Sequence, residues 1–207
     1  MRKGFTLVEL SIVLIIVGLM IGGVMKGSDM INSAEQKKMY NTWIKGWQLA
    51  ISQYQDRTGQ ILGDGIANGG ANAGIDGIFD NINLSIVNTV ATRLREVGLE
   101  VPITNTSTAA NAGGSYIIKG RYTRGTSVML LSNANINTNA RNILQLTNIP
   151  ADVALAIDTM IDGVADAGQG NCVLNTAVAA VAPAAAAWPA ANTGVAAEEL
   201  VTVFIIL

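Results

Sequence analysis

The chain has 207 residues with 13 Lys and Arg against 15 Asp and Glu, a net charge of −2 that gives no basis for nucleic-acid binding. Histidine is absent, which excludes Ser-His-Asp and Cys-His catalytic arrangements. With one cysteine, Cys172, no internal disulfide can form, and we expect a small buried apolar side chain there. No catalytic constellation is found, so we expect a protein that is not an enzyme.

Residues 1–26 combine a basic start, Arg2 and Lys3, with a long apolar run that ends at Lys26. About 20 apolar residues rising roughly 1.5 Å each are long enough to cross a bilayer. The acid Glu9 interrupts the run, and a charge at membrane depth costs roughly 2.5–3.5 kcal/mol on insertion scales. The segment is therefore expected to leave the lipid and pack against copies of itself.

Three interpretations compete for this segment. A secretory signal peptide fits the basic start, but no A-x-A-like cleavage site follows the apolar run. A plain membrane anchor fits the length and leaves Glu9 unexplained. A prepilin-type N-terminus accounts for both the apolar length and Glu9.

The stretch from Arg2 to Leu10 (RKGFTLVEL) resembles the processing motif of type IV pilins and of type II secretion pseudopilins. The resemblance implies cleavage by prepilin peptidase between Gly4 and Phe5, with methylation of the new amino-terminal Phe5. It also implies that Glu9 meets the terminal amine of a neighbouring subunit. Such a pair relieves two charges that are each costly in a low-dielectric setting.

A single helix is predicted from residue 5 to about residue 55. Its first half is apolar all round, and its second half carries an apolar stripe at three- and four-residue spacing that should face a globular domain. The stripe consists of Tyr40, Trp43, Ile44, Trp47, Ala50, Ile51 and Tyr54. Two G-x-x-x-G pairs, within 18–27, indicate either close helix–helix approach or ordinary glycine use in membrane helices. The helix-breaking proline of many type IV pilins is missing, a departure typical of pseudopilins.

The remainder is predicted to alternate loops with short elements. The predictions in chain order are a Gly/Asn/Asp-rich loop over 59–81, a helix from about Asn83 to Val97 closed by Gly98, a β-hairpin over 114–132 with strands 116–118 and 128–131 and a turn near Arg124-Gly125, an Asn/Thr-rich loop, a helix from Pro150 to Gly163, an alanine-rich surface loop over 177–197, and a buried strand over 200–207. The last strand is expected to pair with the hairpin.

These elements predict an α+β fold that is type IV pilin-like, in which a long N-terminal helix packs on a small antiparallel sheet. Residues 1–4 would be a leader peptide and 5–27 the transmembrane or filament-core half of the helix. Residues 28–207 would contain the amphipathic half and a globular periplasmic or extracellular head.

Three acids in the Gly-rich loop, Asp64, Asp76 and Asp80, are the candidate metal ligands, for Ca²⁺. Their spacing does not match a calcium-loop motif. We favour turn chemistry, in which Asp and Asn bond their own backbone, and expect no cofactor. Asp158 and Asp162, one helical turn apart, are expected on a solvated face.

The resemblance implies a structural subunit of a type IV pilus-like filament, with a type II secretion pseudopilin or a minor pilin as alternatives. Its partners would be copies of itself or related subunits, prepilin peptidase and an inner-membrane assembly platform. The precursor would sit in the inner membrane with its N-terminus in the cytoplasm, and the product in a periplasmic or cell-surface filament. The alternative of another class is a membrane-anchored extracytoplasmic binding domain, for which Gly4 and Glu9 would be unnecessary.

Overall fold

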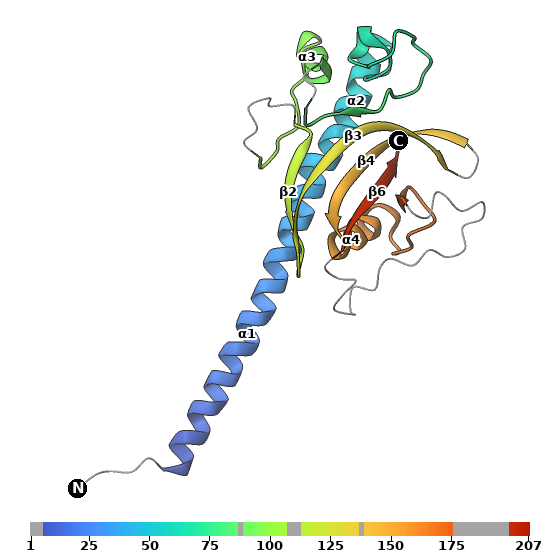
Figure 1. Ribbon diagram of the computed structural model, residues 1–207. Coiled ribbons are helices and arrows are strands. Elements are labelled where there is room, and N and C mark those ends of the chain that lie inside the picture. Colours follow the sequence, from blue (N-terminus) through green and yellow to red (C-terminus); the bar gives the residue numbers. More distant parts are fainter. Residues whose placement is uncertain (1–5, 87–88, 107–112, 137–138, 176–198) are drawn as a thin grey trace.

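The structure is a computed structural model that describes residues 6–86, 89–106, 113–136, 139–175 and 199–207. A long helix carries a globular head on its C-terminal half (Figure 1). The helical elements are α1 (Leu7–Met39), a π-helical turn (Tyr40–Ile44), α2 (Lys45–Thr58), a 3₁₀ turn (Ile66–Asn68), α3 (Thr89–Glu96) and α4 (Ala151–Asp162). The strands are β1 (Ile82–Asn83), β2 (Ser115–Lys119), β3 (Arg124–Ile136), β4 (Asn139–Pro150), β5 (Cys172–Leu174) and β6 (Leu200–Ile206).

The predicted long helix is confirmed, and so is the stripe that faces the head. All seven stripe residues are buried, and Met39 is the first buried residue of the helix. Both indoles of the stripe donate to one carbonyl: Trp43 Nε1 and Trp47 Nε1 lie 2.7 Å and 3.0 Å from the oxygen of Gly113. The helix ends where Gly59 adopts a left-handed φ of 71°, as helix C-termini commonly do.

A π-helical turn interrupts the helix where it enters the head. This turn covers Tyr40–Ile44, and three of its five residues are buried, including Trp43. A π-bulge inserts one residue and so shifts the phase of the side chains on either side. The buried stripe begins at this point, directly after the exposed half of the helix.

The head contains one antiparallel sheet of order β1-β3-β4-β6-β5, with β2 also paired to β3. One face packs against α2 and α4, so the fold is α+β with a long N-terminal helix on a small antiparallel sheet (Figure 1). The C-terminal strand is buried as predicted, but β6 lies between β4 and β5 and pairs with those strands instead of with the predicted hairpin strands.

Two predictions need correction. The helix predicted from Asn83 begins only at Thr89, because Ile82 and Asn83 instead pair with Leu131 and Leu130 of β3. The Asn/Thr-rich loop is wrong as well: its residues extend β3 and form β4, in a ladder that pairs Ser132–Ile136 with 139–143. Pairing between neighbouring strands outweighs the low strand propensity of asparagine.

The predicted hairpin over 114–132 and the predicted helix from Pro150 to Gly163 are confirmed, with small shifts in their boundaries. The hairpin turn lies at 120–123, so Arg124 and Gly125 already belong to β3. α4 ends at Gly163 with a φ of 81°. The predicted alanine-rich loop over 177–197 lies outside the described residues.

Candidate functional site

The N-terminus of α1 is closed by a capping box between Thr6 and Glu9. The backbone nitrogen of Thr6 donates to Glu9 Oε2 at 2.9 Å, and Glu9 N donates to Thr6 Oγ1 at 3.2 Å. The Thr6 hydroxyl also donates to the same carboxylate oxygen at 2.9 Å. In the single chain, Glu9 therefore satisfies the exposed donors of its own helix end. Gly4 and Phe5, the predicted processing residues, lie outside the described residues.

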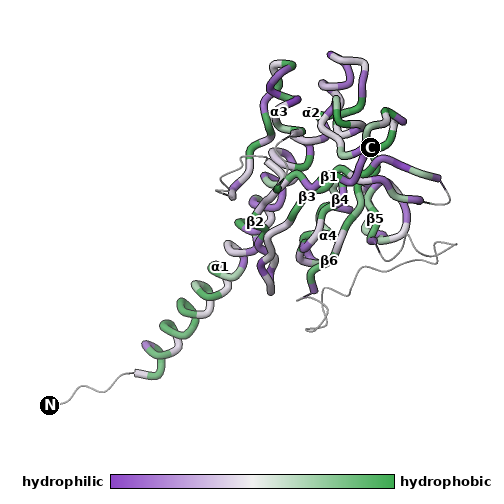
Figure 2. Tube along the Cα trace, turned by 45° about the horizontal axis from the view of Figure 1, so that its top comes forward, coloured by the Kyte–Doolittle hydropathy of each residue, from purple (hydrophilic) through white to green (hydrophobic). Residues whose placement is uncertain are grey.

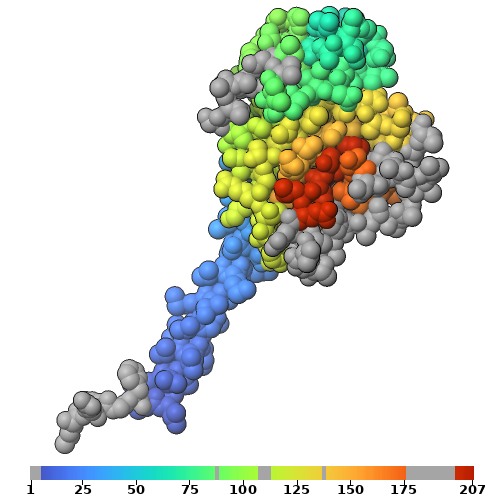
Figure 3. All heavy atoms as spheres, in the orientation of Figure 1, coloured from blue at the N-terminus to red at the C-terminus, as the bar shows by residue number. Residues whose placement is uncertain are grey.

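Beyond the cap, the first half of α1 is apolar and entirely uncovered by the head (Figures 2 and 3). Its exposed large apolar side chains are Leu7, Val8, Leu10, Ile12, Val13, Leu14, Ile15, Ile16, Val17, Leu19, Met20, Ile21, Val24, Met25, Met30 and Ile31. The helix is long and apolar enough to cross a membrane. A surface this apolar requires lipid or another protein surface around it.

The glycines of the two G-x-x-x-G pairs lie on this uncovered half. Among the described residues, no neighbouring atom lies within 4 Å of a Cβ added at Gly18, Gly22, Gly23 or Gly27. The described part of the subunit therefore does not require glycine at these positions, and close approach of a second helix stays a prediction.

The three candidate metal ligands hold the loop after α2 through backbone hydrogen bonds. Asp64 is buried and accepts from the nitrogens of Asp76 and Gly77, at 3.1 Å and 2.7 Å. Asp76 Oδ1 accepts from the nitrogen of Ile78 two residues on, an Asx turn. Among the described residues, no three Asp, Glu or Cys side chains gather where they would hold a metal ion.

Asp80 is the best-bonded of the three acids. It accepts from Gly65 N at 3.0 Å and from Asn72 through N at 2.9 Å and Nδ2 at 2.7 Å. Burial raises the pKa of Asp80, but these hydrogen bonds outweigh it, so the pKa lies below its ordinary value. The carboxylate is thus held ionised as a structural acceptor.

A second pair of acids lies at the C-terminal half of α4, and the predicted solvated face is wrong for one of them. Asp158 is fully buried, whereas Asp162 accepts from the nitrogens of Asn171 and Cys172. Burial, with the nearby charges of Asp158 and Asp162, raises the pKa of the Cys172 thiol. The interpretation of Cys172 as a small buried side chain is confirmed.

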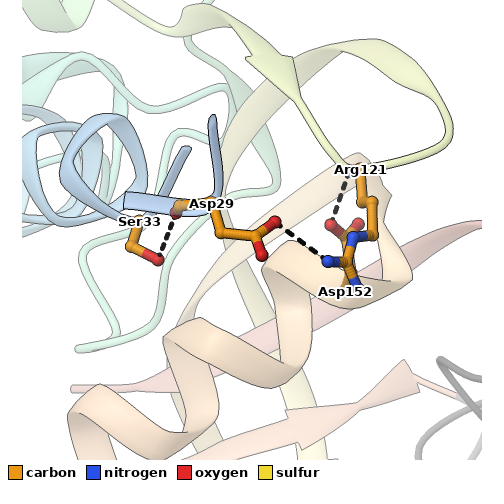
Figure 4. Close-up of polar contacts among 4 residues, drawn as sticks. All are labelled: Asp29, Ser33, Arg121 and Asp152. Carbon is orange, nitrogen blue, oxygen red and sulfur yellow. Dashed lines mark hydrogen bonds and ion pairs between the residues drawn. The ribbon is translucent and has the colours of Figure 1, made fainter. Parts of the chain in front are cut away.

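Polar contacts that were not predicted from the sequence attach the β2–β3 turn to two helices, α1 and α4. Arg121 Nη2 lies 2.9 Å from Asp29 Oδ1, and Arg121 N donates to Asp152 Oδ2 at 2.7 Å (Figure 4). Asp29 and Arg121 are 92 residues apart, so no local pattern indicates their contact. The capping box, by contrast, was readable from the T-x-x-E spacing of Thr6 and Glu9.

Comparison with known families matches residues 1–25 to the family described as "Prokaryotic N-terminal methylation motif". The chain carries this motif, which is the prepilin signal of type IV pilins and pseudopilins. No match is found among curated proteins or among solved structures. The motif supports a pilin-type or pseudopilin substrate of prepilin peptidase, and together with the apolar helix it indicates a membrane-anchored precursor.

Proposed function

We propose that this chain is a structural subunit of a type IV pilus-like filament, assembled through the uncovered half of α1. The observation that carries the proposal is the apolar surface between Leu7 and Ile31, which the subunit leaves exposed behind a prepilin motif. In the precursor, lipid covers this surface. In the filament, the same half-helices of other copies replace the lipid, and the heads lie on the outside.

The basic residues Arg2 and Lys3 support a cytoplasmic N-terminus, because positive charges are retained on that side of the membrane. The head would then lie outside the cytoplasm. Cleavage between Gly4 and Phe5 would place a cationic amine at Phe5, one turn from Glu9.

Glu9 would change partner on assembly. In the single chain its carboxylate caps its own helix through Thr6. In the filament it would face the amine of Phe5 in a neighbouring copy, where an ion pair in a low-dielectric setting depends strongly on both members. This pair would set the axial register between subunits.

The test replaces Glu9 by Gln in the native host. Glutamine retains the capping box but removes the charge, so the helix end is preserved while the intersubunit ion pair is lost. We expect normal cleavage and at least about tenfold less filament, since breaking a buried pair costs about 3–5 kcal/mol. Intact mass reports cleavage, and electron microscopy of sheared surface material reports filaments.

The matched control is Glu35→Gln, which removes the same charge from an exposed position of the same helix. Filament yield from this variant should equal that of the unmodified chain. A normal yield from Glu9→Gln would contradict the proposed pairing. Absence of filaments from the unmodified chain would favour the membrane-anchored binding domain.

A further inference from the structure

The β2–β3 turn lies at the lower end of the head, beside α1 (Figure 1). The sequence from Lys119 to Arg124 reads KGRYTR, and Lys119, Arg121, Tyr122 and Arg124 are all exposed. Tyr122 is 54% exposed, and the Arg121 guanidinium lies 6.0 Å from the centre of its ring. Tyrosine is enriched at membrane–water interfaces, where its ring is partly buried and its hydroxyl is hydrated.

The ion pair between Arg121 and Asp29 sets the height of this turn along the helix. Asp29 follows Lys26, the first charged residue after the apolar run, by three residues. At 1.5 Å per residue that is a rise of about 4.5 Å. The polar layer on each side of a bilayer is about 5–7 Å thick. When residues up to Met25 span the hydrocarbon, the turn lies within the headgroup layer.

The charged side chains of the turn itself are all positive: Lys119, Arg121 and Arg124. Asp29 forms an ion pair with the Arg121 guanidinium, whereas the half-buried Asp152 accepts a hydrogen bond from the Arg121 backbone nitrogen (Figure 4). Two further exposed acids lie nearby: Glu199, whose carbonyl accepts from the nitrogen of Ala151, and Glu35, which lines one pocket with Lys119 and Arg124. In the described part of the chain, Lys26, Lys119 and Arg124 form no ion pair, and all three are exposed.

We infer that the β2–β3 turn docks on the anionic phospholipid headgroups of the bilayer that holds α1 before assembly. Arg121, Arg124 and Lys119 would contact lipid phosphates from the head, Lys26 would do so from the helix, and Tyr122 would sit at the interface. The contact would hold the head in one orientation against the membrane. The inference rests on the proposed function, because it requires the membrane-inserted precursor.

The experiment uses full-length precursor in vesicles of phosphatidylcholine alone or with phosphatidylglycerol. Thr123→Cys carries a fluorophore at the turn, and Ala73→Cys carries it on the exposed loop at the opposite end of the head. Native Cys172 is fully buried and does not compete for the label. A quencher on the lipid headgroup reports contact with the bilayer surface.

We expect at least about twofold stronger quenching at position 123 in phosphatidylglycerol vesicles, and none of this increase at position 73. Each cation near an anionic surface strengthens association by about fivefold. Arg121→Gln with Arg124→Gln should therefore abolish the increase. The control, Arg93→Gln with Arg95→Gln, removes the same charge from α3 and should leave the increase intact.

Equal quenching of both labels would overturn this inference but not the proposed function. Quenching at position 123 that does not change with phosphatidylglycerol content would do the same. Quenching that rises with the amount of protein per vesicle, and not with lipid charge, would also overturn it. That result would indicate that the turn contacts a second copy of the chain. Flotation of the precursor with the vesicles is scored separately. A precursor that fails to insert in either vesicle would contradict the proposed function, and this inference with it.

Discussion

Asp80 holds the loop after α2 through three hydrogen bonds, from Gly65 and Asn72. Replacing Asp80 by Asn puts an NH₂ group against backbone donors and removes the charge. We expect the free energy of unfolding to fall by about 1–2 kcal/mol at neutral pH. Chemical denaturation of the head measures this change.

The same residue predicts a pH dependence. Because the pKa of Asp80 is lower in the folded chain than its ordinary value of 3.8, its contribution is complete above pH 3.8. It is lost as the pH falls through the lower folded pKa. The difference in unfolding free energy between the unmodified chain and Asp80→Asn should therefore shrink below that pH. The exposed Asp56→Asn is the control, and a difference that persists unchanged at low pH would refute the assignment.

Residues that act through a local pattern were predictable, and those that act across the fold were not. Glu9 was identified because a lone charge inside an apolar run is costly wherever the run resides. The contacts of Arg121 were not predicted, because its partners Asp29 and Asp152 lie on two helices, α1 and α4, that are far from it in the sequence. Asp64, Asp76 and Asp80 accept hydrogen bonds from loop nitrogens, and calcium binding by them stays the untested alternative to the turn chemistry that the sequence favours.

At the scale of elements, Asn142 joins the middle of the sheet to the loop after α2. Its Oδ1 accepts from Phe79 N at 3.0 Å, and its Nδ2 donates to the carbonyl of Gly77 at 2.9 Å. We expect Asn142→Ala to lower the unfolding free energy by about 1–2 kcal/mol and to expose this loop. Faster amide hydrogen exchange over 76–80 measures the effect. Asn139→Ala, on the exposed end of β4, should leave those amides unchanged, and equal exchange in both variants would refute the role.

Elements with strong periodicity were predicted well, and elements made by pairing were not. The stripe from Tyr40 to Tyr54 repeats with the helical period, so it identified both the helix and its buried face. β4 contains several Asn and Thr residues, and only its partners β3 and β6 make it a strand. The helix predicted from Asn83 failed for the same reason, because β1 pairs with β3.

The whole molecule consists of two parts that meet different surroundings. The head has a continuous core in which the stripe of α2 packs against the sheet. The apolar half of α1 before it is exposed in the described part of the chain and extends away from the head (Figure 3). One subunit alone cannot cover this surface, which is why the account requires lipid first and other subunits afterwards.

The proposed function requires that the precursor is processed and moves from the membrane into a filament. Its most direct test is the intact mass of this protein recovered from sheared filaments of the native host. We expect a chain that lacks Met1 to Gly4 and carries one added methyl group. A chain that retains Met1, or one found only in the membrane fraction, would contradict it.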